Sequence, residues 1–134
     1  MIGLDTNVLL RLGDDLEPAQ QGRALALIRS QGFGGCFVNG IVLCEFSWTL
    51  RHSYKMTRSE IAARLAVLLE LPELVIASPE EAARALQRFR VGPADFADYF
   101  LAEINRSAGC ASTATFDADA IKSGEPFVPV PKFS

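Results

Sequence analysis

Hydrophobic and polar positions alternate along this chain in blocks that predict strands and helices in turn. Compact apolar runs predict buried strands over 1–4, 36–38, 74–77 and 110–115. A last, short edge strand is expected around 127–128, because prolines surround it.

Longer segments with apolar residues at helical spacing predict the helices. They are expected over 8–12, from Asp14 to about Arg29, and over 41–54, 57–71, Ser78 to the break at Gly92-Pro93, 95–108 and 117–122. Thr57 and Glu60 have the spacing of a capping box. Ser78, followed by Pro79, is expected to cap the next helix.

Strands that alternate with helices predict an α/β fold with a parallel sheet between helices, formed by one domain over 1–134. The apolar runs are too short to span a bilayer. The first residues show no basic segment followed by an apolar run, so we expect a cytoplasmic protein that does not enter a membrane.

Cysteine and histidine usage excludes several kinds of site. The three cysteines, Cys36, Cys44 and Cys110, are an odd number without CxxC spacing, so they form neither a disulfide framework nor a zinc site. Each has apolar neighbours and is expected to be a buried thiol. His52 is the only histidine, which excludes a two-histidine acid–base mechanism. Trp48 fits the core better than a base-stacking platform.

The net charge of −3 counts against a nucleic-acid partner, because phosphate binding usually leaves a basic surface. Several of the 16 acids would have to be clustered and neutralised by metal to reconcile this charge with such a partner.

Acids from four segments are candidates for one site. Asp5 follows the first predicted strand and Asp117 the fourth, whereas Glu45 and Asp98 lie near the beginnings of two helices. Parallel sheets place their sites at the carboxyl ends of strands. We therefore expect the four side chains at one rim of the sheet.

These acids have mostly apolar neighbours, which is unusual for solvated charges. Two carboxylates 4 Å apart repel by about 4 kcal/mol at a protein-like dielectric, so a cluster needs a counter-charge. Oxygen ligands select hard cations such as Mg²⁺ or Mn²⁺. Such ions activate water for phosphodiester hydrolysis without a protein base. The alternative is that the acids only cap helices or lie in solvent.

The order of these motifs resembles the PIN domain, and most closely the VapC-like toxins of prokaryotic toxin–antitoxin pairs. The motifs are Leu4-Asp5-Thr6-Asn7, Glu45 in a helix, Asp95-Phe96-Ala97-Asp98 and Thr115-Phe116-Asp117. The resemblance covers 1 to about 130. It implies a three-layer sandwich, in which helices flank a central parallel sheet of four to five short strands, and Mg²⁺- or Mn²⁺-dependent ribonuclease activity.

The resemblance also implies roles for individual residues. The implied catalytic and metal-binding acids are Asp5, Glu45, Asp98 and Asp117. The implied site-ordering residues are Thr6, Asn7 and Thr115. Asp119 stands where some members have a further acid, and Asp95 fits a helix cap better than a ligand.

Three partners follow from the same resemblance: an RNA substrate, a small cognate antitoxin that inserts a basic side chain into the site, and a second copy in a homodimer. The apolar helices over 41–54 and 61–71 suit such protein partners or the core equally well. Arg11, Arg51 and Lys55 are expected near the rim, either as phosphate contacts or as ordinary solvated cations.

Other functions stay open. A nuclease of this kind could act in RNA processing or on DNA flaps, since a toxin also needs a neighbouring antitoxin gene. A non-catalytic module could bind RNA or hold a cation only structurally, in which case Asp5→Asn would change stability and leave RNA cleavage at background. A phosphotransfer receiver domain fits less well, because Lys122 follows an acidic loop rather than a late strand.

Overall fold

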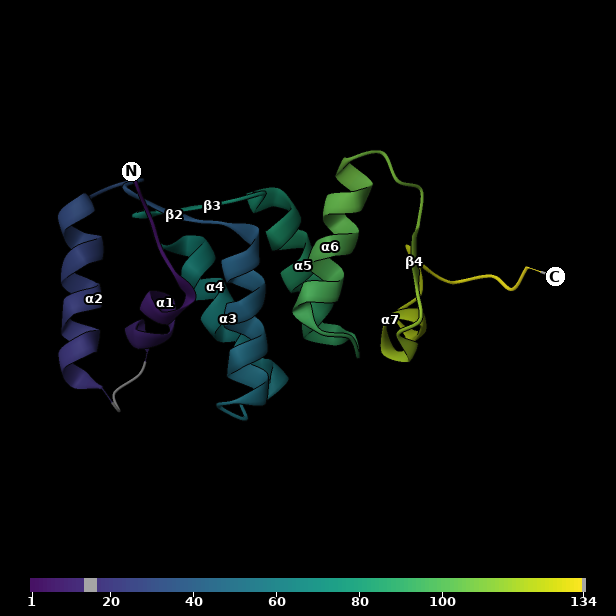
Figure 1. Ribbon diagram of the computed structural model, residues 1–134, viewed down its shortest axis with the longest axis horizontal. Coiled ribbons are helices and arrows are strands. Elements are labelled where there is room, and N and C mark those ends of the chain that lie inside the picture. The colour runs from purple at the N-terminus through teal and green to yellow at the C-terminus, as the bar shows by residue number, and fades with distance from the viewer. Residues whose placement is uncertain (14–16, 134) are drawn as a thin grey trace.

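Strands and helices alternate along the chain in the computed structural model, which describes residues 1–13 and 17–133 (Figure 1). The strands are β1 (Ile2–Gly3), β2 (Cys36–Val38), β3 (Leu74–Ile76), β4 (Thr113–Thr115) and β5 (Phe127–Pro129). The helices are α1 (Thr6–Leu12), α2 (Pro18–Gln31), α3 (Gly40–His52), α4 (Arg58–Glu70), α5 (Pro79–Val91), α6 (Phe96–Ser107) and α7 (Ala118–Lys122). The predicted helix start at Asp14 lies outside the described residues.

All strand pairs are parallel, so the predicted α/β fold with flanking helices is confirmed. The described strands form two sheets rather than one. The first has the order β1-β2-β3, with Ile2 opposite Cys36 and Cys36 opposite Leu74. The second pairs β4 with β5, with Thr113 opposite Phe127.

The separation of the two sheets follows from the side chains of the fourth strand. β4 carries only Thr113, Ala114 and Thr115, which offer little apolar surface to a central position. Its neighbour β5 carries Phe127, which is 5% exposed and packs with its ring centroid 6.1 Å from that of Tyr99 on α6. The packing of β5 against α6 therefore determines where β4, its only partner strand among the described residues, lies.

The molecule is elongated, and its helices stand in a row (Figure 1). α2 lies at one end of the long axis and the unit formed by β4, α7 and β5 at the other, with α3, α4, α5 and α6 between them. No helix in the described part of the chain is long and apolar enough to cross a membrane.

The core lies where the central strand meets the helices, and two expectations about it are wrong. Cys36 and Val38 of β2 are fully buried. Cys110, however, is exposed and Cys44 only half-buried; Cys110 lies in the connection between α6 and β4 instead of belonging to the strand. Trp48 is 57% exposed and packs on His52, because it lies on the outer face of α3.

The predicted helix starts of α4 and α5 are both confirmed, but only α4 has the expected side-chain cap. Thr57 accepts a hydrogen bond from the Glu60 amide and the Glu60 carboxylate accepts one from the Thr57 amide, which confirms the capping box of α4. Ser78 does not cap α5 through its side chain, because its backbone is left-handed, with φ 52°.

The loop that leads into α6 is tightly held. A Cβ at Gly92 would collide with the hydroxyl of Tyr99, so only glycine fits there. The guanidinium of Arg58 donates to the carbonyls of Phe89, Pro93 and Ala94 at 2.9, 3.0 and 2.8 Å. These bonds fix the position from which α6, with Asp98, begins.

Candidate active site

The first group of candidate acids lies where β1 ends. Asp5 is the N-cap of α1, and its Oδ1 accepts a hydrogen bond from the Thr6 amide at 2.8 Å. The buried Thr6 hydroxyl donates to Oε2 of Glu45 on α3 at 3.1 Å. Thr6 therefore links the end of β1 to α3 and orients the carboxylate of Glu45.

The second group surrounds a cavity of about 140 Å³ between α3, the start of α6 and the end of β4. Its lining includes Asp95, Asp98, Asp117 and Asp119, together with Arg51, His52 and Ala94. Asp98 lies in the first turn of α6, and its Oδ2 accepts a hydrogen bond from the Asp95 amide at 3.2 Å. Four carboxylates thus gather around one small, polar hollow.

The loop after β4 is ordered by its own side chains. Asp117 is the N-cap of α7, and its Oδ1 accepts from the amides of Asp119 and Ala120 at 2.8 and 3.0 Å. The Thr115 hydroxyl accepts from the Asp117 amide at 3.0 Å. Thr115 therefore supports the turn that presents Asp117, and the exposed Asp119 follows one residue into α7.

The electrostatics of this second group favour a cation. Burial, followed by the negative charges of Asp117 and Asp119, raises the pKa of Asp98 from its ordinary value, and the positive charge of Arg51 opposes the shift. Burial and the charge of Asp98 likewise raise the pKa of the Cys44 thiol. The charge of Asp98 is therefore incompletely compensated in the protein alone.

Arg51, whose charge lowers the pKa of Asp98, also has an acidic partner of its own. Its guanidinium forms an ion pair with Asp95, the N-cap residue of α6. Asp95 therefore has the structural position expected of it, and its carboxylate has a cationic partner that the sequence did not reveal. In the sequence, only the three-residue spacing of Asp95 and Asp98 indicated that both carboxylates lie on the same face of the first turn of α6.

The donors suit Mg²⁺ or Mn²⁺ in kind, since they are carboxylate oxygens. Their placement is incomplete. Among residues 1–13 and 17–133, no three histidine, cysteine or acidic side chains are grouped closely enough to hold a metal ion. Thr6 links Asp5 to Glu45, whereas Asp98 and Asp117 line a cavity whose lining includes neither Asp5 nor Glu45.

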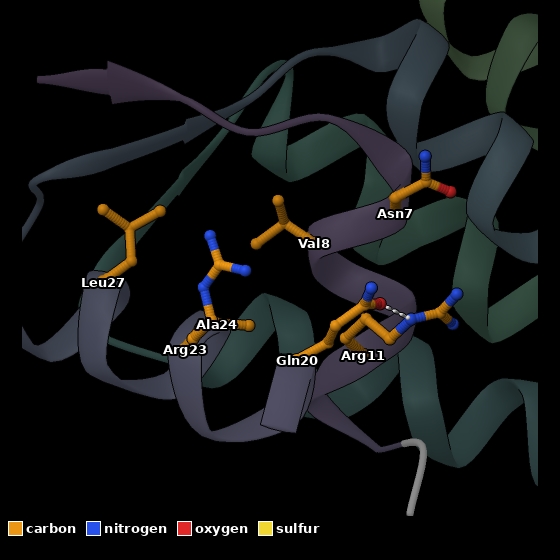
Figure 2. A pocket seen from close by; sticks show the side chains of 7 residues that line it. All are labelled: Asn7, Val8, Arg11, Gln20, Arg23, Ala24 and Leu27. Carbon is orange, nitrogen blue, oxygen red and sulfur yellow. Dashed lines mark hydrogen bonds between the residues drawn. The ribbon is translucent and has the colours of Figure 1, made fainter. Parts of the chain in front are cut away.

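The expected RNA-contacting cations have different surroundings. Arg11 and Asn7 line a pocket of about 400 Å³ between α1 and α2, where Arg11 Nε donates to Gln20 at 2.6 Å (Figure 2). Lys55 is exposed just after α3, with a left-handed backbone. Arg51 is the one of the three predicted cations that lines the acidic cavity.

Comparison with known proteins gives a family match over most of the chain. The family model described as "PIN domain" matches residues 2–125, a range that contains both groups of acids. No curated protein matches the sequence.

Proposed function

Because this chain belongs to the PIN-domain family, we propose that it is a metal-dependent endoribonuclease that acts as the toxin of a toxin–antitoxin pair. PIN domains are generally nucleases, and they generally use divalent metal ions. The chain therefore has a nuclease fold, and the metal, the RNA substrate and the toxin role are the proposal.

The observation that supports the proposed nuclease activity most strongly is the acidic cavity between α3, α6 and the end of β4. Asp98 is half-buried there, beside Asp117 and Asp119, with its pKa raised. A carboxylate held at this cost in free energy is better suited to binding a cation than to lying in solvent.

Each acid has a distinct task in this proposal. Asp98 and Asp117 would be the first ligands of a divalent ion, and Asp119, Asp5 and Glu45 would join them only by moving closer than they lie in this structure. When bound, the ion would supply a water of lowered pKa and would offset negative charge on the scissile phosphate. Thr6 and Thr115 are positioning residues, because their hydroxyls hold Glu45 and the turn before Asp117.

Recognition of the RNA backbone falls to the cations around the cavity. Arg51 lines the cavity and is held by Asp95, so its guanidinium is fixed where a phosphate would approach the acids. A fixed guanidinium loses little conformational freedom when it binds phosphate. Arg11 and Lys55 would extend the contact along α1 and beyond α3.

The test is RNA cleavage by the protein purified without a co-expressed partner. The substrates are tRNA, rRNA fragments and single-stranded DNA, each incubated with Mg²⁺, Mn²⁺ or EDTA. Wild type is compared with Asp5→Asn and Asp98→Asn. Glu80→Gln is the matched control, because Glu80 is an exposed acid on α5 away from the cavity.

We expect cleavage of RNA that requires metal, persists in Glu80→Gln and falls at least about 100-fold in both site variants, as for the loss of a catalytic electrostatic contact. Cleavage that survives in both site variants would refute the assigned site. The toxin role predicts growth arrest when the chain is expressed alone, relieved by co-expression of a small neighbouring gene. Cleavage without growth arrest would instead indicate RNA processing or DNA-flap cleavage, distinguished by the substrate that is cut.

A non-catalytic binding module is the second candidate, and one observation favours it. Within the described residues, the acids do not converge in groups of three that could hold a metal ion. In that case folded wild type would bind Mn²⁺ in a calorimeter, or RNA in a filter assay, and cut none of the substrates.

A further inference from the structure

A pocket with a mixed polar and apolar lining lies between α1 and α2 (Figure 2). Its volume of about 400 Å³ is within the range of pockets that hold small organic ligands. It shares no lining residue with the acidic cavity between α3, α6 and the end of β4. The two sites can therefore have different ligands.

The two helices form this pocket because of how their side chains are spaced. Asn7 and Arg11 are four residues apart on α1, so both lie on one face of that helix. Gln20, Arg23 and Leu27 recur at three- and four-residue spacing on α2 and form the opposite wall. The N-cap of α1 is the first acid of the candidate site. One wall of the pocket therefore belongs to the same helix turn as that acid.

One part of the lining is apolar. Ala24 is buried, and Val8 and Leu27 are half-buried against the core. A phosphate ion binds through charge and hydrogen bonds and gains nothing from such a surface, whereas the ring face of a nucleobase gains by leaving water. The apolar part of the lining therefore favours a heteroaromatic ring over an inorganic anion.

The polar part of the lining consists mainly of hydrogen-bond donors. The guanidinium groups of Arg11 and Arg23 can only donate. The side-chain oxygen of Gln20 accepts a hydrogen bond from Arg11 Nε at 2.6 Å, so the group that Gln20 keeps for a ligand is its donating amide nitrogen. Arg11 also donates to the Tyr54 hydroxyl at 3.3 Å. The pocket therefore suits a ligand that presents acceptors.

Arg23 is the donor best placed to bind such a ligand. Figure 2 shows its guanidinium between Leu27 of its own helix and Val8 of α1. Within residues 1–13 and 17–133, Arg23 forms no hydrogen bond or ion pair, whereas Arg11 is held by Gln20. A guanidinium in this position can offer two parallel N–H groups to one ligand.

Guanine is the RNA base that best matches two parallel donors beside an apolar surface. Its N7 and O6 are adjacent acceptors, and one arginine can bond to both, whereas adenine has an amino group beside N7. Uracil separates its two carbonyls by an N–H group, and the single ring of cytosine covers less apolar surface than a purine does. Bases of single-stranded RNA can turn out of the stack and enter such a pocket.

We propose that the pocket between α1 and α2 binds one unstacked guanine of a single-stranded RNA. Arg23 donates to N7 and O6 of the base, and the ring lies against Val8, Ala24 and Leu27. The bound guanine then determines which part of the strand is held near the acids, and so where the strand is cut. This consequence for cleavage rests on the proposed function, whereas the binding of guanine does not.

Binding of mononucleotides tests the pocket without any cleavage. GMP, 7-deaza-GMP, AMP, CMP and UMP are titrated in EDTA and followed by chemical-shift changes of the labelled protein. We expect GMP to bind at least about 5-fold more tightly than the other four, as for a bidentate arginine contact to guanine. 7-Deaza-GMP tests the contact itself, because it lacks only the N7 acceptor. Ribose 5-phosphate that binds as tightly as GMP would overturn the proposal, since the pocket would then recognise phosphate alone.

Substitutions of Arg23 test which side chain reads the base. Arg23→Ala should fold as wild type does, because Arg23 is exposed, and it should lose the preference for GMP. Arg23→Lys should not restore the preference, because one ammonium group cannot bond to both acceptors as a guanidinium does. Arg29→Ala is the matched control, since Arg29 is an exposed arginine of the same helix that does not line the pocket. A preference for GMP that persists in Arg23→Ala, or no binding of GMP by folded wild type at millimolar concentration, would overturn the proposal.

Cleavage of a short RNA with a single guanosine connects the pocket to the proposed function. We expect wild type and Arg29→Ala to cut at a fixed distance from the guanosine, and Arg23→Ala to cut without this preference. Cutting without regard to guanosine, by a wild type that does not bind GMP, would refute the pocket and leave the nuclease intact. Selective binding of GMP without any cleavage would refute the proposed function and leave the pocket intact. Selective binding with cuts that ignore guanosine would overturn the connection between the two.

Discussion

Replacing Arg58 with alanine should destabilise the protein more than any substitution of a solvated arginine. Arg58 belongs to the first turn of α4, yet its guanidinium donates three hydrogen bonds to the carbonyls of the loop between α5 and α6. Its guanidinium carbon also lies 4.4 Å from the centroid of the Phe89 ring. Arg58 therefore holds three helices in register at the point where α6 begins.

The magnitude follows from these contacts. Each bond from a charged donor contributes about 1 kcal/mol when the donor is partly exposed, and the cation–π contact adds about 0.5 kcal/mol. The expected loss for Arg58→Ala is therefore about 3.5 kcal/mol. In a chain of this size that loss lowers Tm by about 10 °C. Arg58→Lys should recover about a third of the loss, because an ammonium group cannot reach all three carbonyls.

Thermal unfolding followed by circular dichroism measures the effect, with urea unfolding to give the free energy directly. Arg90→Ala is the control, because Arg90 is exposed on α5 and should change stability by less than about 0.5 kcal/mol. A Tm loss for Arg58→Ala no larger than that for Arg90→Ala would refute the reasoning. Wild-type stability in Arg58→Lys would also refute the reasoning, since a single ammonium group would then replace the three hydrogen bonds of the guanidinium.

Three further substitutions have definite expected outcomes. Thr57→Ala should cost about 1 kcal/mol in urea unfolding, because it removes the capping box, whereas Thr57→Ser should stay near wild type. Arg84→Met should lower the free energy of unfolding by about 2 kcal/mol, because it leaves the buried Glu103 carboxylate without the guanidinium that donates to it at 3.0 Å. Adding Glu103→Gln should restore part of that stability. An equal loss in the double variant would contradict the ion-pair explanation. Asp98→Asn should raise the stability of the metal-free protein by up to about 1 kcal/mol at neutral pH, because burial and the charge of Asp117 raise the pKa of Asp98. Wild type without metal should therefore lose stability as pH rises from the ordinary aspartate pKa through the raised one, and Asp98→Asn should lack this pH dependence.

Features decided by neighbouring residues were readable from the sequence. The capping box of Thr57 and Glu60, the apolar strands around Cys36 and Leu74, and the break at Gly92-Pro93 depend on contacts within a few residues. The positions of Asp5 and Asp117, each two residues beyond the end of a strand, are of the same kind. Local periodicity and capping chemistry suffice for such features, because the interacting groups are close along the chain.

Features that depend on contacts with elements far away in the sequence could not be predicted from local patterns. The exposure of Trp48 depends on which face of α3 the other helices cover, and the left-handed backbone of Ser78 depends on how β3 leads into α5. The pairing of Arg51 with Asp95 joins α3 to the start of α6. No local pattern contains these contacts, since their partners come from other elements.

The sequence by itself determined the elements, the parallel α/β class and the acids that are candidates for chemistry. Only the tertiary structure decided how the strands are grouped and therefore which acids meet. β4 has short side chains and no strong preference for a neighbour, so the burial of Phe127 against Tyr99 fixes its place. Strand pairing is a non-local choice made by packing, and in this protein that choice places the strands before Asp5 and Asp117 in different sheets.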